Sequence, residues 1–273
     1  MSTYCYVNGD IQPTDNGVIG ITDLALQRGY GVFDFGRTHN GKLFHFADNI
    51  ARLRQSAREL HLEVPLSDQE IMAIAQQLID RSDLRTPAVR LLLTGGNSGL
   101  SPKQPNLIMI AEELPTYPDV YFSQGATLIT MEYQRELPQV KSINYMNSIR
   151  MEQKKRQHNA LDLLYYNRQS ITESPRSNFF AFCGDALITP AEDILYGITR
   201  KIVLQLAATE FHIEERDIPV EALANIDEAF LTSTSKNVLP VSTIDNQSIG
   251  DGKVGRNTKK LMAMFQQYLE NYS

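Results

Sequence analysis

Lys141 is the strongest candidate for a chemically active residue in this sequence, because of the groups that follow it along the chain. It lies in the stretch Val140–Tyr145, and a lysine whose amine is neutral is a nucleophile toward carbonyl compounds. Further on come a carboxylate at Glu173 and two groups of small and hydroxyl-bearing residues, over 197–199 and 232–235. A single lysine is more often an exposed surface residue, so the role of Lys141 depends on the whole ordered set.

Glu173 and Tyr145 supply groups suited to a pyridine ring that carries a phenolate oxygen. Glu173 follows the strand-like residues 170–172, and a carboxylate beside a pyridine nitrogen keeps the ring protonated and able to accept electrons. The hydroxyl of Tyr145 can donate a hydrogen bond to the ring oxygen. A glutamate that caps a turn and a tyrosine that packs in a core are the structural alternatives. Together with Lys141, these groups fit pyridoxal 5'-phosphate.

The phosphate of such a cofactor needs donors, and the sequence offers three groups of them. Residues 197–199 precede an apolar helix over 202–208, where free backbone amides and the helix dipole attract anions. The hydroxyls and amides of 232–235 follow a strand and can form an anion-binding nest, and an arginine can bind a phosphate through two nitrogens. The predicted phosphate ligands are Arg52, Gly197, Ile198, Thr199, Ser233 and Thr234.

Strands and helices alternate along the chain and predict an α+β (mixed α/β) fold that positions these groups. Strands are predicted at 4–7, 32–37, 43–46, 89–94, 107–111, 126–131, 163–166, 178–182, 186–189 and 229–232. Helices are predicted at 48–60, from 67 onward, and at 145–158, 202–209 and 258–268, with Asp48 as an N-cap and a capping box at Ser67. Asn8-Gly9 and Asn40-Gly41 predict hairpin turns.

Two prolines, Pro115 and Pro118, mark the best candidate for a linker, over residues 117–122. The chain of 273 residues is at the upper edge of single-domain size. We therefore expect a small N-terminal domain over 1–116 and a larger cofactor-binding domain over 123–273.

Composition argues against several other classes of protein. The net charge of −6 gives no attraction to nucleic acid or anionic lipid, and no apolar run approaches the ~20 residues that a membrane helix needs. Two distant cysteines and the lack of a secretory signal favour a cytoplasmic protein. The five histidines lack the spacing of metal ligands, so we predict no metal.

Several short motifs, in order along nearly the whole chain, resemble the fold-type IV (class IV) pyridoxal-phosphate enzymes. This family includes D-amino acid transaminases, branched-chain aminotransferases and 4-amino-4-deoxychorismate lyases. The motifs that carry the resemblance lie at 28–34, 49–53, 141–145, 172–174 with 177–178, 197–200 and 250–255.

The resemblance implies a role for each matching residue. Lys141 binds the cofactor covalently and moves the proton, Glu173 pairs with the pyridine nitrogen, and Tyr145 approaches the ring oxygen. The phosphate is held by Arg52, Ile198, Thr199 and Thr234, and Ser177 and Asn178 belong to the same cofactor site. The family fold has a small N-terminal α/β domain and a larger domain with a β-barrel-like core. The family is also homodimeric, with active sites near the interface and the segment Arg28–Tyr30 reaching the partner's site.

The substrates implied are an amino acid and a 2-oxo acid, whose carboxylates need cations. Arg90 alternates into an apolar strand and therefore needs an anionic partner, since a buried unpaired charge is costly. The predicted substrate-binding residues are Arg28, Phe33, Arg90, Ser235 and Lys236. The three cations among these residues, Arg28, Arg90 and Lys236, would suit a substrate pair rich in carboxylates, such as glutamate and 2-oxoglutarate.

The handedness of the substrate stays open at this point. D-amino acid transaminases of this family have a tyrosine at the position of Phe33 and an Arg-x-His motif near Ser98 to Pro105, and this chain lacks both. We favour a non-standard D-amino acid transaminase. The alternatives are a branched-chain L-transaminase, a lyase of aminodeoxychorismate and a cofactor-binding protein without catalysis.

Overall fold

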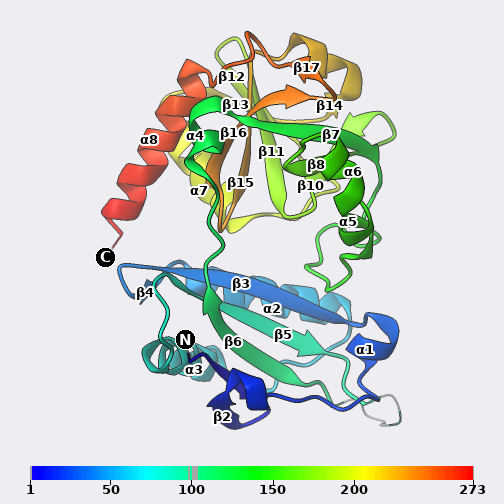
Figure 1. The fold of residues 1–273 in the computed structure, drawn as a ribbon, viewed down its shortest axis with the longest axis vertical. Coiled ribbons are helices and arrows are strands. Elements are labelled where there is room, and N and C mark those ends of the chain that lie inside the picture. The colour runs from blue at the N-terminus through cyan, green and yellow to red at the C-terminus, as the bar shows by residue number, and fades with distance from the viewer. Residues whose placement is uncertain (1, 98, 100–103, 273) are drawn as a thin grey trace. The chain divides into compact units, whose positions relative to one another are not determined.

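The structure is a computed structural model that describes residues 2–97, 99 and 104–272 (Figure 1). Contacts divide the chain into two compact units. The first comprises the chain up to Pro115 together with Val140–Asn144, and the second comprises Thr116–Gln139 together with the chain from Tyr145 onward. The division expected at 117–122 does not include the assignment of Val140–Asn144 to the first unit. Lys141 therefore belongs to the first unit.

An antiparallel sheet of six strands forms the first unit, in the order β2-β1-β6-β5-β3-β4. The hairpins expected at Asn8 and Asn40 are confirmed, because each has a positive φ and joins two paired antiparallel strands. The strands are β1 (Tyr4–Val7), β2 (Asp10–Pro13), β3 (Gly31–His39), β4 (Lys42–Leu43), β5 (Pro87–Thr94) and β6 (Leu107–Glu113).

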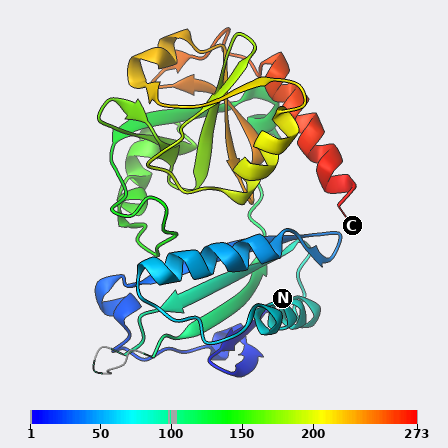
Figure 2. The same ribbon diagram turned by 180° about the vertical axis from the view of Figure 1, so that it is seen from behind.

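Helices α2 (Phe46–Glu59) and α3 (Asp68–Arg81) pack on this sheet, and α2 runs across the front of it in Figure 2. Ile50 and Leu53 of α2 and Leu91 of β5 are fully buried in the shared core. Alternation along a strand sends every second side chain to the opposite face. The face of β3 that is turned away from this core is therefore the one that can present side chains to a ligand.

The starts of these two helices were only partly predicted by the sequence. The capping box at Ser67 is confirmed, because Ser67 and Glu70 exchange the expected hydrogen bonds. The prediction of Asp48 as an N-cap is wrong. α2 begins two residues earlier, at Phe46, with His45 at the N-cap position, and Asp48 lies in the first turn.

A second sheet of eleven strands forms the core of the second unit. Its main path runs β13-β12-β11-β15-β16-β7-β8-β9-β14, with β10 paired to β11 and β17 paired to β16. Within the described part of the chain no pairing joins the two ends of this path, so the barrel-like core remains an expectation. The strands are β7 (Ala126–Glu132), β8 (Asp162–Asn167), β9 (Ser170–Ile171), β10 (Glu173–Ser174), β11 (Ser177–Cys183), β12 (Ala186–Thr189), β13 (His212–Glu215), β14 (Ile218–Pro219), β15 (Glu228–Ser233), β16 (Asn237–Ile244) and β17 (Gln247–Ser248).

Two helices, α7 (Ile198–Ala207) and α8 (Arg256–Glu270), pack on strands β15 and β16. The helix expected over 145–158 is divided at Met151 into two short ones. The remaining helices are α1 (Leu24–Arg28), α4 (Asp119–Gln124), α5 (Met146–Arg150), α6 (Glu152–Gln157) and the 3-10 turns η1 (Thr14–Asn16) and η2 (Val220–Asn225). None of the helices within residues 2–97, 99 and 104–272 is long and apolar enough to cross a membrane.

Candidate active site

The segment that carries Lys141 is fixed to strand β3 and helix α2 by its own backbone. The Lys141 amide donates to Oγ of buried Ser56 at 3.1 Å, and its carbonyl accepts from the amide of Phe33 at 2.9 Å. A β-bridge between Val32 and Ser142 continues the pairing. The amine of Lys141 lies 4.5 Å from the centre of the Phe33 ring. The lysine is therefore held in place from both sides, with its amine against an aromatic face.

A buried carboxylate, Asp34, lies one residue along β3 and binds Arg52 of α2. Nε and Nη2 of Arg52 donate to Oδ2 and Oδ1 of Asp34 at 2.8 and 2.9 Å, and Asn49 donates to Oδ1 at 2.7 Å. Burial alone would raise the pKa of Asp34, but the charge and hydrogen bonds of Arg52, together with the charge of Lys141, hold that pKa below its usual range. Asp34 is thus an anion that fixes Arg52 and also acts on Lys141.

Sequence reasoning gave no role to Asp34 or Ser56, although both orient predicted site residues. A signal for Asp34 existed in the sequence, since an acidic residue in the apolar strand 32–37 requires a buried partner. Ser56 left no comparable signal, because a serine in a helix is most often exposed.

Glu173 is buried on β10, and both of its carboxylate oxygens have partners in the second unit. Nε of Arg135 donates to Oε1 at 2.9 Å, and the amide of Leu195 donates to Oε2 at 3.0 Å. Arg135 also donates to the carbonyl of Pro138. Sequence reasoning missed Arg135, which lies in a loop without a motif. Glu173 is therefore held as an oriented acceptor whose position depends on Arg135.

The start of α7 offers the backbone amides that the sequence predicted. Nδ2 of Asn178 donates to the carbonyl of Leu195 at 2.7 Å and so fixes the loop before the helix. A Cβ at Gly197 would lie 2.2 Å from Oδ1 of Asn178, so a larger residue there would displace the Asn178 side chain that holds this loop. Gly197 provides no side-chain cap. Among the described residues the amides of Ile198 and Thr199 have no acceptor, which leaves them for an anion.

The turn between β15 and β16 lies at the same end of the sheet as the start of α7. Thr232 pairs in register with Asn178, whose side chain holds the loop before that helix. The hydroxyl of Thr232 is buried without a hydrogen-bond partner in the described part of the chain. Thr234 and Ser235 follow at the turn, both half-buried. An unpaired hydroxyl, an uncapped helix and a hydroxyl-rich turn form a donor set that fits a phosphate.

Lys236 and Ser177, two of the predicted site residues, are hydrogen bonded to each other. Lys236 is 1% exposed, and its Nζ donates to Oδ2 of Asp162 at 2.9 Å and to Oγ of Ser177 at 2.8 Å. Its ammonium is enclosed by protein groups and does not present a cation to a substrate. Ser177 accepts a hydrogen bond from Lys236, and the substrate-docking role expected of Lys236 remains a prediction.

The other predicted residues are distributed over both units. Arg90 has the anionic partner that its strand required, because it forms a two-nitrogen ion pair with Glu112 and stacks on the ring of Phe35. Arg28 is exposed at the end of α1, and one of its guanidinium nitrogens donates to the neighbouring carbonyl of Gln27. Tyr145 is half-buried at the N-cap of α5. The sequence lacks an Arg-x-His motif in the loop near Ser98 to Pro105. Most of that loop, residues 98 and 100–103, lies outside the described residues.

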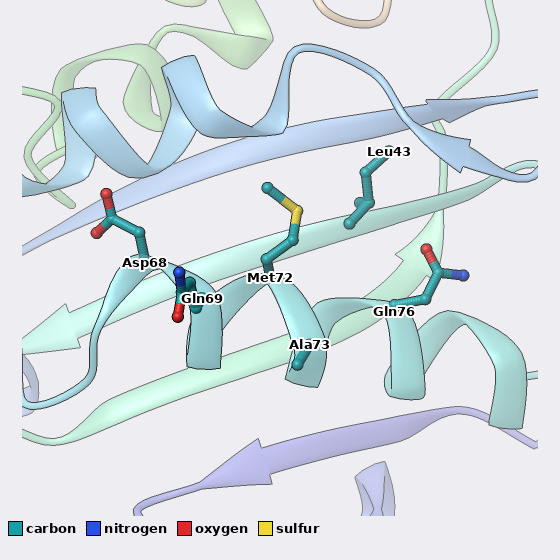
Figure 3. Close-up of a pocket in the computed structure, with 6 residues that line it drawn as sticks. All are labelled: Leu43, Asp68, Gln69, Met72, Ala73 and Gln76. Carbon is teal, nitrogen blue, oxygen red and sulfur yellow. The ribbon is translucent and has the colours of Figure 1, made fainter. Parts of the chain in front are cut away.

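A shallow hollow of about 540 Å³ lies on the first unit and contains none of the predicted site residues (Figure 3). It is lined by Leu43, Asp68, Gln69, Met72, Ala73 and Gln76. Among the residues that the structure describes, no three histidine, cysteine or acidic side chains gather in a way that could bind a metal.

Comparison with known proteins identifies the class to which this fold and these groups belong. The family model for class IV aminotransferases matches residues 31–244. A D-alanine aminotransferase of Listeria monocytogenes is 32% identical over 95% of this chain and 93% of its own length. A D-alanine aminotransferase of Staphylococcus aureus is 29% identical over 98% of both chains.

Solved structures agree on the fold. The branched-chain aminotransferase of Escherichia coli has a TM-score of 0.92 and 23% identity over 98% of this chain and 95% of its own. A hypothetical aminotransferase of Mycobacterium tuberculosis, solved in its pyridoxal-phosphate-bound form, has a TM-score of 0.84 and 20% identity over 97% of this chain and 98% of its own. This chain is a member of the class IV aminotransferase family. It is a pyridoxal-phosphate-dependent aminotransferase with a mixed α/β fold of two sheets.

Proposed function

We propose that this protein transfers an amino group from a D-amino acid to a 2-oxo acid such as 2-oxoglutarate, with Lys141 as the catalytic residue. The names of its relatives, D-alanine aminotransferases of two organisms, support the D configuration. The observation that carries the proposal is the placement of Lys141. Its backbone is hydrogen bonded on both sides, and its amine lies against Phe33 beside the Asp34–Arg52 pair.

The residues of the proposed site divide the tasks of the reaction among them. Pyridoxal phosphate, when bound, supplies an electron sink for the α-carbon of the substrate. Lys141 holds the cofactor covalently, and its neutral Nζ, once released by the substrate amine, removes the α-proton and later returns a proton. Glu173 accepts from the ring nitrogen and Tyr145 donates to the ring oxygen. The phosphate is held by Arg52, Ile198, Thr199 and Thr234, in the cofactor site that also contains Asn178, Gly197 and Ser233.

The substrate carboxylates are proposed to dock on Arg90 and on Arg28, with Phe33 and Ser235 beside them. Arg90 is half-exposed, and its pairing with Glu112 directs the guanidinium along the sheet face that also carries Phe33 and Phe35. A planar guanidinium held in this way binds a carboxylate through two hydrogen bonds.

We further propose a homodimer. Val18, Ile21 and Leu26 are largely exposed apolar residues in the segment that leads to Arg28. An exposed apolar surface is costly in water and is a common mark of an interface. A second copy that covers this segment would also bring Arg28 to the partner's site.

A half-reaction screen with paired D- and L-amino acids tests the proposed function. The holoenzyme is mixed with each amino acid, and conversion of the bound cofactor is followed by absorbance. We expect conversion by D-alanine or D-glutamate and none by L-leucine or L-isoleucine. The reverse result would establish the branched-chain L-transaminase. Pyruvate release from aminodeoxychorismate without a 2-oxo acid would establish the lyase, and the lack of any shift would establish a non-catalytic binding protein.

Lys141→Ala tests the assignment of the catalytic amine. We expect the transamination rate to fall by roughly 10²–10⁴-fold, since proton transfer by a positioned side chain contributes about that factor. Borohydride should no longer attach the cofactor to the protein, as judged by its mass. The control is Lys42→Ala, an exposed lysine of β4, which should keep both properties. Covalent attachment or normal turnover in Lys141→Ala would exclude Lys141 from this role.

A further inference from the structure

Lys236 is a charged side chain in the interior of the second unit, and it lies directly after the hydroxyl-rich turn. Its Nζ has Asp162 and Ser177 as hydrogen-bond partners at 2.9 and 2.8 Å, and the ring of Tyr117 lies 5.5 Å away. Lys236 and Asp162 are each 1% exposed. An ammonium has three donors, and this arrangement directs them into the protein.

A buried ion pair is a poor source of stability, because the cost of removing two charges from water roughly offsets their attraction. What such a pair does supply is a fixed geometry, since each charge is strongly disfavoured in any position where it lacks the other.

The side chain of Lys236 ties one end of the turn to two other strands. Asp162 begins β8, and Ser177 begins β11 immediately before Asn178. The backbone of Lys236 also belongs to the turn itself, because its amide donates to Oγ of Ser233 at 3.2 Å. The next residue, Asn237, has a positive φ of 54° and pairs with Ser233 where the strands close.

The same ties connect the turn to the start of α7. Ser177 accepts from Lys236, and its neighbour Asn178 holds the carbonyl of Leu195 before the helix. Thr234 lies between two anchored residues, Ser233 and Lys236. The positions of its amide and hydroxyl therefore depend on how firmly those two residues are held. One ammonium thus links the turn to β11, the strand whose second residue holds the loop before α7.

We propose that Lys236 is a positioning residue for the cofactor phosphate, which acts by locking the 233–236 turn to Asp162 and Ser177 in register with the start of α7. The inference rests on the proposed function, in which this turn and that helix bind the phosphate of pyridoxal phosphate. Lys236 itself touches neither cofactor nor substrate. A hydrogen bond to a phosphate is sensitive to small displacements of its donor, which is why the lock affects binding.

The test compares two ligands that differ only in the phosphate. Dissociation constants of pyridoxal phosphate and of pyridoxal are measured for full-length apoprotein with wild-type sequence and with Lys236→Met. We expect the dissociation constant of pyridoxal phosphate to rise about tenfold, the effect of losing one charge-assisted hydrogen bond. That of pyridoxal should stay within about twofold, because Lys141 and Glu173 bind the ring in both ligands. The matched control is Lys253→Met, an exposed lysine, which should change neither.

A purely structural role for Lys236 predicts a different result. Equal weakening of both ligands, or an unchanged affinity for pyridoxal phosphate, would overturn the proposal. If Lys236→Met fails to fold because Asp162 is left unpaired, Lys236→Met/Asp162→Asn removes both charges and should show the same loss that is selective for the phosphate. A wild-type protein that binds both ligands equally would overturn the proposed phosphate site itself. That outcome concerns the wild type alone and is therefore distinguishable from the results on the variants, which test the role of Lys236.

Discussion

Each unit of the molecule contains one buried aspartate paired with one cation, and the two pairs differ in what the cation can reach. Asp34 pairs with Arg52 in the first unit, and Asp162 pairs with Lys236 in the second. The Arg52 side chain is 14% exposed, whereas that of Lys236 is 1% exposed. The cation of the first pair is therefore partly accessible to solvent, whereas the cation of the second pair is enclosed.

The chemistry of the cations matches this difference. A guanidinium has five donors in a rigid fork, so a carboxylate can hold one edge while the rest of the group points elsewhere. A lysine ammonium is a compact point charge that two or three close acceptors surround completely. These geometries support the proposed ligand-binding role of Arg52 and the proposed positioning role of Lys236.

Removal of each aspartate's charge should give the largest difference between the pairs. Asp162→Asn leaves the fully buried Lys236 without its counter-charge, and we expect a loss of about 3–5 kcal/mol in the free energy of unfolding. Asp34→Asn should cost about 1–2 kcal/mol, because Arg52 can turn its charge toward water. Urea unfolding of the two variants measures both.

A double variant checks the cause of that difference. Asp162→Asn/Lys236→Met should recover most of the loss seen in Asp162→Asn, since a methionine buries no charge. Equal losses in the free energy of unfolding for the two aspartate variants, or no recovery of stability in the double variant, would contradict this explanation. The burial of the cation would then not determine the cost of removing its aspartate.

Arg52→Lys gives a smaller effect, on ligand binding more than on stability. A lysine can keep one contact to Asp34 but cannot present a planar fork to a phosphate. We expect the dissociation constant of pyridoxal phosphate to rise about tenfold, or ~1.4 kcal/mol. Arg54→Lys is the matched control, because Arg54 lies on the same helix and pairs with the exposed Asp68. A similar loss in both variants would remove the special role of Arg52.

The sequence predicted the cations of these pairs but neither aspartate. Arg52 and Lys236 stand in or beside short motifs, and a motif shows which residue types are present near a site. It does not show which way each side chain points. The sequence therefore groups Lys236 with Arg90 as a substrate cation, although its ammonium turns inward to a strand 74 residues away in sequence. Long-range partners of this kind are set by strand order, which no local pattern contains.

Local features were predicted more completely. The hairpins at Asn8 and Asn40 and the capping box at Ser67 depend only on neighbours within three residues, and each is confirmed. Lys141 lies between these two cases. Its motif predicts the role of the residue, but the anchors at Phe33 and Ser56 come from segments more than 80 residues away and could not be predicted.

The dependence of stability on pH gives the smallest effect and tests whether both aspartates are anions in the folded protein. Burial acts to raise the pKa of each, but the paired cation outweighs it, so the pKa of Asp34 and that of Asp162 are lowered. A carboxyl group with a lowered pKa stabilises the fold at pH values above its unfolded pKa, about 3.9. That contribution is lost as pH falls through the folded pKa. The advantage of the wild type over Asp34→Asn and Asp162→Asn should therefore be constant between about pH 5 and 7 and shrink below about pH 4.

Urea unfolding of the wild type and both variants over this range provides the measurement. The wild-type advantage over each variant should shrink as the pH falls through the lowered pKa of the aspartate that the variant lacks. A wild-type advantage that grows as the pH falls would mean that the aspartates are protonated in the folded state. The same result would leave Arg52 and Lys236 without an anionic partner and remove the reason for the inward direction of Lys236.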